Sequence, residues 1–369
     1  MNTYTKTYKP YERIKNIVSL LRSSQVKKAS EEIRTFPKND LIGSSNEKLL
    51  EQYFLDTIHQ YIEKNAWEVP NLYLIDDNHE QIKLFNLMAK KFILVTEAQE
   101  MVNRLIRNQL TLESCQSDTI SIMDIGIGSG QQLCKILKLW YESHIVFPKL
   151  IYVYGIEPSV ESLSLAQERL EKIAIDYGFL LKFIPFNMTI EEMMVENWSN
   201  INEMVYLTGS RLVVNASFSL HHIPIKDRDK IFIRLQNLKP SLFTFIEPYA
   251  DYITEDLMTK FNSAWQHYLM TFSVIDDMSV TEEEKLSIKT KFFGREIQDI
   301  FSENSIERYE TAEMWLMRME LMEFCTYNYH KAITDYDKDP RLDYEFRPGY
   351  VTLGVHNVPI VTVGSVFSE

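Results

Sequence analysis

A chain of 369 residues is long enough for one large domain with additions, or for two domains. Apolar residues make up 45% and charged residues 25%, as in soluble globular proteins, and no apolar run approaches the roughly 18 residues of a membrane span. The formal net charge of −13 argues against nonspecific binding to nucleic acid, which requires neutralisation of phosphates. The three cysteines form no C-x-x-C pair, so neither a zinc ribbon nor a disulfide framework is indicated, and a cytoplasmic location is expected.

Residues 1–80 are expected to form a helical cap region. Two apolar stripes recur there at helical spacing: Ile14, Ile17, Val18 and Leu21, then Leu49, Leu50, Tyr53, Phe54 and Ile58. Residues 1–30 carry seven Lys or Arg and one acidic residue. Because this segment lacks the apolar run of a signal peptide, we expect a solvated helical arm rather than a targeting or lipid-binding segment.

A helical pattern precedes the first predicted strand, and it carries Thr96 and Gln99. These residues share a helix face because they are three positions apart. They are either exposed polar residues or groups that face a cofactor, and we include both in a candidate cofactor-binding set.

The most informative stretch is ISIMDIGIGSG, residues 120–130. It predicts a buried strand ending at Asp124, a turn through Gly126, Gly128 and Gly130, and then a helix. Glycines allow backbone N–H groups to approach a ligand closely at the positive end of a helix. The alternative is a tight turn without a ligand.

A second apolar run, 150–156, ends in Glu157, where an acid can bind both hydroxyls of a ribose. The glycine spacing is G-x-G-x-G, and Asp124 would repel a pyrophosphate but can meet an ammonium group. The stretch DIGIGSG resembles motif I of the class I methyltransferases, which implies S-adenosylmethionine as the cofactor.

Two further strands add polar residues to the same predicted edge. Asn187 and Met188 follow the third strand, 180–186, where a residue commonly faces the adenine; the alternative is an Asn that closes a turn. Asn215 lies in the fourth strand, 211–216, and completes the candidate cofactor-binding set.

Three residues are candidates for a base or for positioning an acceptor. His221 and His222 follow the fourth strand, and Glu247 follows the fifth, 242–246. A histidine there can act as a general base because its pKa lies near working pH. The alternatives are a packed His-His element and an ion-paired structural acid. No compact ligand cluster predicts a metal site.

The remaining chain is expected to cover and complete the sheet. Residues 251–320 predict a helical insertion acting as a substrate cap, and 321–369 predict closing strands, with a charge-rich loop at 335–347 and a hairpin around Asn357. Residues 81–250 would form the cofactor-binding core. The predicted fold is an α/β Rossmann-like sheet of the class I methyltransferase type, with about seven strands, helices on both faces and a helical cap.

Taken in order, several segments resemble the GRAS family, in particular its bacterial members, which keep methyltransferase features. The segments are NEKLLEQYF (46–54), FILVTEAQEM (92–101), IMDIGIGSGQQ (122–132), VNASFSLHH (214–222), FTFIEPYA (243–250), GREI (294–297), ERYE (307–310), WLMRM (315–319) and PIVTVGSVF (359–367). The Trp of the family's terminal S-A-W segment is absent. Plant members often lose the glycine series that is intact here.

The first hypothesis is therefore an S-adenosylmethionine-dependent methyltransferase that acts on a small molecule held under the cap. The second is a non-catalytic GRAS-type interaction scaffold that still binds the cofactor. An aminopropyltransferase and a DNA-binding protein are weaker alternatives. The expected partners are a small-molecule substrate and a second copy in a homodimer, and neither nucleic acid nor a membrane.

Overall fold

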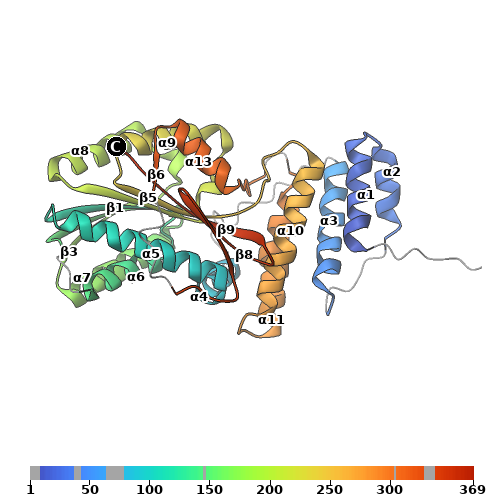
Figure 1. Ribbon diagram of the computed structural model, residues 1–369, viewed down its shortest axis with the longest axis horizontal. Helices are drawn as coiled ribbons and strands as arrows, with labels where there is room; N and C mark the ends of the chain where they lie inside the picture. The colour runs from blue at the N-terminus through green and yellow to red at the C-terminus, as the bar shows by residue number, and fades with distance from the viewer. Residues whose placement is uncertain (1–8, 37–42, 64–78, 144–146, 303–304, 328–336) are drawn as a thin grey trace, which may run out of the picture. The chain divides into compact units, whose positions relative to one another are not determined.

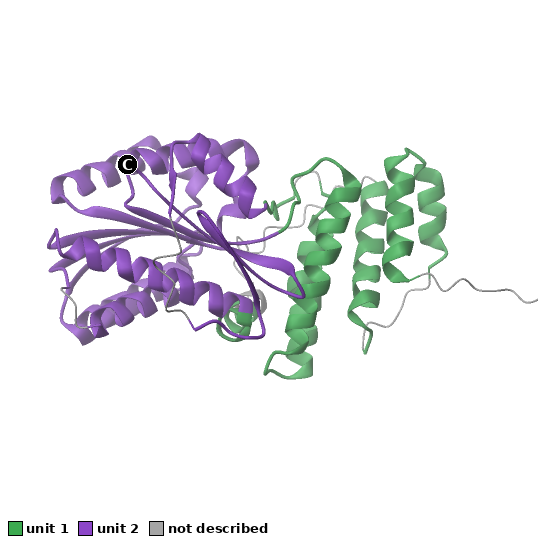
Figure 2. Cartoon of the chain, in the orientation of Figure 1, with its two compact units in different colours: residues 1–71, 79–93, 250–310 green, residues 72–78, 94–249, 311–369 purple. Residues whose placement is uncertain are grey.

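The computed structural model describes residues 9–36, 43–63, 79–143, 147–302, 305–327 and 337–369 (Figure 1). The chain divides into two compact units (Figure 2). Unit 1 comprises residues 1–71, 79–93 and 250–310, and unit 2 comprises residues 72–78, 94–249 and 311–369. Unit 1 thus joins segments from both predicted cap regions, and unit 2 joins segments from the predicted core and the closing strands. The four-part division at 80, 250 and 320 stays a prediction.

Unit 2 is built on one mixed sheet, which has nine strands in the described residues rather than about seven. The strand order is β3-β2-β1-β4-β5-β9-β8-β7, and β6 pairs with β9. The strands are β1 Thr119–Ile125, β2 Leu150–Ile156, β3 Leu180–Phe186, β4 Arg211–Ser217, β5 Leu242–Pro248, β6 Cys325–Thr326, β7 Asp343–Arg347, β8 Tyr350–Val355 and β9 Val358–Phe367. The first five are parallel, and β9 runs antiparallel to β5.

Helices cover both faces of this sheet (Figure 1). On one face lie α5 Ile93–Ser114, α6 Gln131–Glu142 and α7 Val160–Tyr177. On the other lie α8 Val195–Thr208, α9 Ile225–Asn237 and α13 Ala312–Leu321. The short turns η2 Ile190–Glu192 and η3 Leu220–His222 add Ile190 and Leu220 to the apolar core. The second face carries a large apolar core that includes Trp315, Phe232 and Phe243, all fully buried. The prediction of an α/β sheet with helices on both faces is confirmed.

One strand lies where the sequence predicts a loop. In β7, half-buried Tyr344 and Phe346 alternate with exposed charged residues, the pattern of a strand covered on one face. The strand pairs with β8 at the edge of the sheet. The predicted hairpin is confirmed: β8 and β9 pair antiparallel, and His356 and Asn357 between them both have positive φ, as a two-residue hairpin turn requires.

Unit 1 is helical. Its helices are α1 Pro10–Arg22, α2 Val26–Arg34, α3 Asn46–Glu63, α4 His79–Lys91, α10 Leu257–Asp276, α11 Glu282–Ser287, the π-helical turn η4 Ile288–Phe292 and α12 Phe293–Asp299. An aromatic core joins α3 and α10, because the Phe54 ring lies 5.2 Å from that of Phe261 and 5.7 Å from that of Trp265. The expected solvated arm is wrong for α1, since Ile14 and Ile17 are fully buried. Within the described residues, every helix is too short or too polar to cross a membrane.

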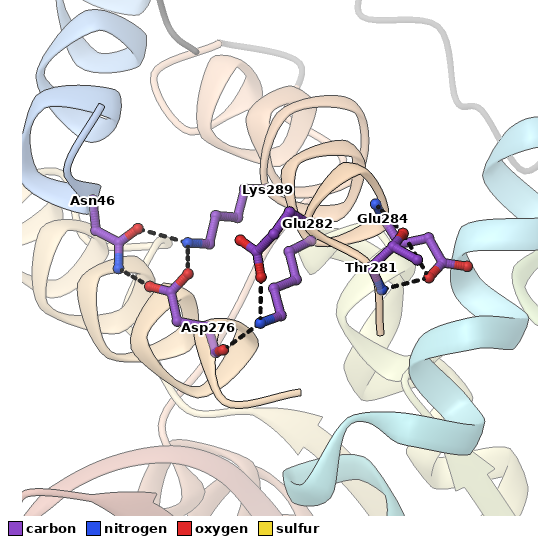
Figure 3. A network of polar contacts seen from close by, with 7 residues as sticks. Asn46, Asp276, Thr281, Glu282, Glu284 and Lys289 are labelled. Carbon is purple, nitrogen blue, oxygen red and sulfur yellow. Dashed lines mark hydrogen bonds and ion pairs between the residues drawn. The ribbon is translucent and has the colours of Figure 1, made fainter. Parts of the chain in front are cut away.

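A polar network fixes the end of α10 within unit 1 (Figure 3). Lys289 is buried, and its ammonium donates to Asn46 Oδ1 at 2.7 Å and forms an ion pair with Asp276. Asn46 in turn donates to Asp276 Oδ2 at 2.7 Å. Each of the three side chains therefore contacts the other two, and the network holds the start of α3 against the end of α10.

Replacing Lys289 by Met is expected to lower the free energy of unfolding by about 1–2 kcal/mol, because the half-exposed Asp276 keeps Asn46 but loses its cation. Urea unfolding measures this loss. Lys172→Met is the control, because Lys172 is exposed and pairs with the exposed Asp176, so its loss is expected to cost clearly less. Equal losses in the two variants would contradict the prediction.

Candidate functional site

The candidate site lies where the order of the parallel strands reverses. From β1 the sheet continues through β2 and β3 on one side, and through β4 and β5 on the other. In open α/β sheets, ligands bind at the carboxyl ends of the strands at such a switch point. The carboxyl ends of β1 and β4 carry most of the predicted site residues.

The three glycines form the turn after β1, and all have positive φ, of +73°, +51° and +72° for Gly126, Gly128 and Gly130. A Cβ at Gly126 would lie 2.8 Å from Ser219 Cβ, and one at Gly130 would lie 3.1 Å from Ala166. A Cβ at Gly128 would meet no atom within 4 Å. Two glycines therefore serve close packing, and Gly128 presents its backbone to open space.

Glu157 binds the glycine turn. Its carboxylate accepts the Gly128 N–H at 3.1 Å and the Ser159 N–H at 3.0 Å, one on each oxygen. Burial raises the pKa of Glu157, and these two hydrogen bonds oppose the rise. Each carboxylate oxygen can accept a further hydrogen bond. The predicted pairing of the first glycine turn with the acid after the second strand is thus present in the structure.

Asp124 is buried, with 4% of its surface exposed. Asn215 donates to Asp124 Oδ1 at 2.9 Å, and Thr244 donates to Asn215 Oδ1 at 3.1 Å. Burial raises the pKa of Asp124 to about 7; the bond from Asn215 opposes this rise and the nearby Glu157 adds to it. A buried carboxyl group near neutrality is a common feature of functional sites.

Asn187 and Met188 have local contacts. The Asn187 amide donates to the carbonyl oxygen of Pro158 at 2.7 Å, so it holds the turn that contains Glu157. This contact is the turn-closing alternative, and the amide remains exposed. Met188 packs partly buried against the large apolar core. Their roles toward an adenine stay predictions.

A polar chain that the sequence analysis missed connects β4, α6 and α5. The Ser217 hydroxyl donates to Gln132 Oε1 at 2.8 Å, and Gln132 Nε2 donates to Asn103 Oδ1 at 3.2 Å. Thr96 and Gln99 are half-buried. Asn103 follows them by seven and four positions, so the three residues lie on the same face of α5. That spacing is the signal that could have identified Asn103.

The three candidate catalytic residues lie together, with Glu247 and His221 buried and His222 half-buried. Glu247 is fully buried; its Oε1 accepts the N–H groups of Ser219 at 3.0 Å and Leu220 at 2.7 Å. Its Oε2 lies 2.5 Å from His221 Nδ1, and the rings of His221 and His222 are 4.0 Å apart. Glu247 thus holds the η3 turn in place.

Ser219 joins the two sets of candidates. Its hydroxyl donates to the carbonyl oxygen of Ile125 at 2.8 Å, and its Cβ is the atom that a side chain at Gly126 would strike. The glycine turn and the η3 turn therefore pack against each other. A change in one is expected to displace the other.

Comparison with known proteins identifies relatives over most of the chain. The model of the GRAS domain family matches residues 16–341. Scarecrow-like protein 1 of Arabidopsis thaliana is 26% identical over 239 residues, which are 60% of this chain and 39% of the relative. The DELLA protein RGL3 of the same plant is 23% identical and is matched over 58% of this chain and 41% of its own length. The chain thus spans about two-fifths of these relatives.

A solved structure confirms the fold. The crystal structure of SCL7 in Oryza sativa has a TM-score of 0.76 at 18% identity, covering 98% of this chain and 100% of that one. The DszA carbon methyltransferase reaches a TM-score of only 0.45 at 11% identity.

These comparisons correct the first functional hypothesis. The prediction of a methyltransferase enzyme is wrong, because the sequence relatives are Scarecrow-like and DELLA proteins and the whole-chain structural match is SCL7. The catalytic roles given to His221, His222 and Glu247 depended on that hypothesis. The physical reason for the error is that a glycine turn and an acid describe how a nucleoside is bound and carry no information on turnover. With the family model matched over most of its length, the chain belongs to the GRAS domain family.

Proposed function

We propose that the chain is a non-catalytic regulatory scaffold of the GRAS type that binds S-adenosylmethionine as a ligand at the glycine turn. The scaffold role is supported by the family match and by the Scarecrow-like and DELLA relatives. The bacterial type and the homodimer stay predictions. The observation that carries the ligand is the intact turn, in which Gly128 opens to free space beside the Glu157 carboxylate.

The residues present fit this ligand. Glu157 keeps acceptor capacity on both oxygens for the two hydroxyls of a ribose. Asp124, ionised above its pKa of about 7, would face the cationic part of the ligand. The backbone at Gly128 lets a ligand approach without meeting a side chain.

Bound S-adenosylmethionine brings a sulfonium cation, an amino-acid group and an adenosine, and here it would act as a regulatory ligand. Binding would restrain the glycine turn, and through Ser219 it would restrain the η3 turn held by Glu247. A ligand that binds one conformation of a scaffold better than another shifts the population toward it. This route gives a bound metabolite an effect on the surface of unit 2.

Calorimetric titration of S-adenosylmethionine into the wild type and Glu157→Ala tests the proposal. We expect micromolar binding (about −8 kcal/mol) to the wild type and at least a tenfold loss in the variant, because the ribose acceptors are removed. Glu161→Ala is the matched control: it removes the same charge from an exposed position in the first turn of α7 and is expected to change affinity less than twofold. If the wild type does not bind S-adenosylmethionine at millimolar concentration, the ligand role is rejected.

A further inference from the structure

The side-chain amide of Asn103 is buried, with 1% exposure, and within the described residues its Nδ2 has no hydrogen-bond partner. Its Oδ1 is already used, because it accepts from Gln132. Leaving a buried amide donor unpaired costs about 1–3 kcal/mol, and folded proteins retain few such groups. Other buried side chains of the described residues, including Trp140 and Trp198, also have an atom without a partner, so this donor points to a ligand through its position beside the glycine turn.

The polar chain places this donor next to the glycine turn. Gln132 is the second residue of α6, and Gly130 occupies the N-cap position just before it. Ser217, at the other end of the chain, is the last residue of β4, one of the two strands at the switch point. Asn103 is thus connected by two hydrogen bonds to the edge of the sheet where the ligand is proposed to bind.

The start of α6 provides a second, independent feature. Because Gly130 has no side chain, no side-chain acceptor caps the first-turn N–H groups of this 12-residue helix. The uncapped N–H groups and the helix dipole favour an anion there. An amide donor and an uncapped helix start are the partners that a carboxylate requires.

The anion has to be part of a larger ligand. Asp124 and Glu157 are both acidic and lie on the strand side of the same turn, so a free inorganic anion would be repelled. A zwitterion with a carboxylate at one position and a cationic group at another satisfies both sides. This pattern matches the amino-acid part of an adenosyl amino acid.

We infer that Asn103 is a specificity-determining residue whose amide donates to the ligand's carboxylate, so that the site selects a nucleoside with an amino-acid tail over one without it. The inference rests on the proposed ligand role of the glycine turn, and it identifies Asn103 as the residue that recognises the ligand's amino-acid tail. Gln132 and Ser217 are positioning residues, because they hold the Asn103 amide with its donor side free.

The test compares two ligands that differ in the tail, S-adenosylhomocysteine and 5′-methylthioadenosine, by calorimetry on the wild type and Asn103→Leu. We expect the variant to bind S-adenosylhomocysteine at least tenfold more weakly and 5′-methylthioadenosine within twofold of the wild type. Because leucine also leaves Gln132 Nε2 without its acceptor, the ratio of the two affinities, and not the melting temperature, is the readout. A purely structural Asn103 would change both affinities alike. Asn108→Leu, on the same helix, is the control and is expected to discriminate neither ligand.

The outcomes separate this inference from the proposed function. If the wild type binds neither ligand, the proposed function fails and the inference fails with it. If the wild type binds both, and Asn103→Leu weakens both equally or neither, the inference alone is overturned. Should Asn103→Leu fail to fold, Asn103→Asp, which keeps Oδ1 as the acceptor for Gln132 and replaces the amide donor by an oxygen, provides the same comparison.

Discussion

Replacing Glu247 by Leu is expected to lower the free energy of unfolding by about 3–5 kcal/mol, because it strips partners from several buried groups at once. The N–H groups of Ser219 and Leu220 would lose their common acceptor, and His221 Nδ1 would lose its carboxylate. Urea denaturation at neutral pH measures the effect. Because the η3 turn also contacts the glycine turn through Ser219, we expect a loss of ligand affinity as well.

Two controls make the Glu247 prediction specific. Glu247→Gln keeps an oxygen acceptor for the two N–H groups and is expected to cost about 1–2 kcal/mol. Glu320→Leu changes an exposed acid on α13 and is expected to stay within 0.5 kcal/mol, as surface substitutions do. If Glu247→Leu were no less stable than Glu247→Gln, the structural role of this carboxylate would be disproved.

Asp124→Asn is expected to stabilise the ligand-free protein by about 1–2 kcal/mol at pH 8 while weakening S-adenosylmethionine binding at least tenfold. The pKa of about 7 in the folded protein lies above the ordinary aspartate value of 3.8, so the folded state favours the protonated carboxyl group. Protonation of Asp124 therefore contributes to the free energy of unfolding; this contribution is fully present below pH 3.8 and is lost as the pH rises through 7. The stability of Asp124→Asn does not fall with pH in this way, because asparagine does not ionise. It also retains an oxygen that accepts from Asn215.

The pH dependence distinguishes this effect from a general change in packing. The stability difference between Asp124→Asn and the wild type is expected to be smallest near pH 4 and to grow toward pH 8, as measured by thermal or urea unfolding. Asp118→Asn, which changes an exposed acid just before β1, is the control. Its stability difference from the wild type is not expected to grow between pH 4 and pH 8. A difference that stays constant from pH 4 to 8 would contradict the buried-carboxyl explanation.

The parallel strands could be predicted from the sequence because each is a mainly apolar run bounded by turn residues. The bounds predicted for 150–156 and 180–186 match β2 and β3. The edge strand β7 could not be predicted in this way. Its charged residues read as a loop, and only pairing with β8 shows that Tyr344 and Phe346 alternate toward one face.

Some residues of the candidate site could likewise be predicted from sequence patterns, and others could not. Asp124 and Gly128 belong to one local motif, and Glu157 could be paired with them because an acid at the end of the second parallel strand is part of a known pattern; the structure brings them together. Asn103 depends on a contact with Gln132, 29 positions away, and no local pattern identifies such a partner. A helix face that already carried Thr96 and Gln99 was the available hint.

Sequence motifs cannot distinguish a scaffold from an enzyme here, and the reason is physical. Hydrogen bonds that hold a ribose and an amino acid are the same whether or not the methyl group is transferred. Glu247 illustrates the point: its position at the end of the fifth strand made it a candidate base, with a structural acid as the alternative, and its contacts with Ser219, Leu220 and His221 stabilise the fold.

A crystal structure grown with S-adenosylhomocysteine tests most directly whether the glycine turn of this GRAS chain is a ligand site. We expect the ligand beside Gly128, with both ribose hydroxyls at hydrogen-bond distance, about 2.6–3.0 Å, from the Glu157 carboxylate. A ligand bound elsewhere on the chain, or crystals without ligand at millimolar concentration, would contradict the claim.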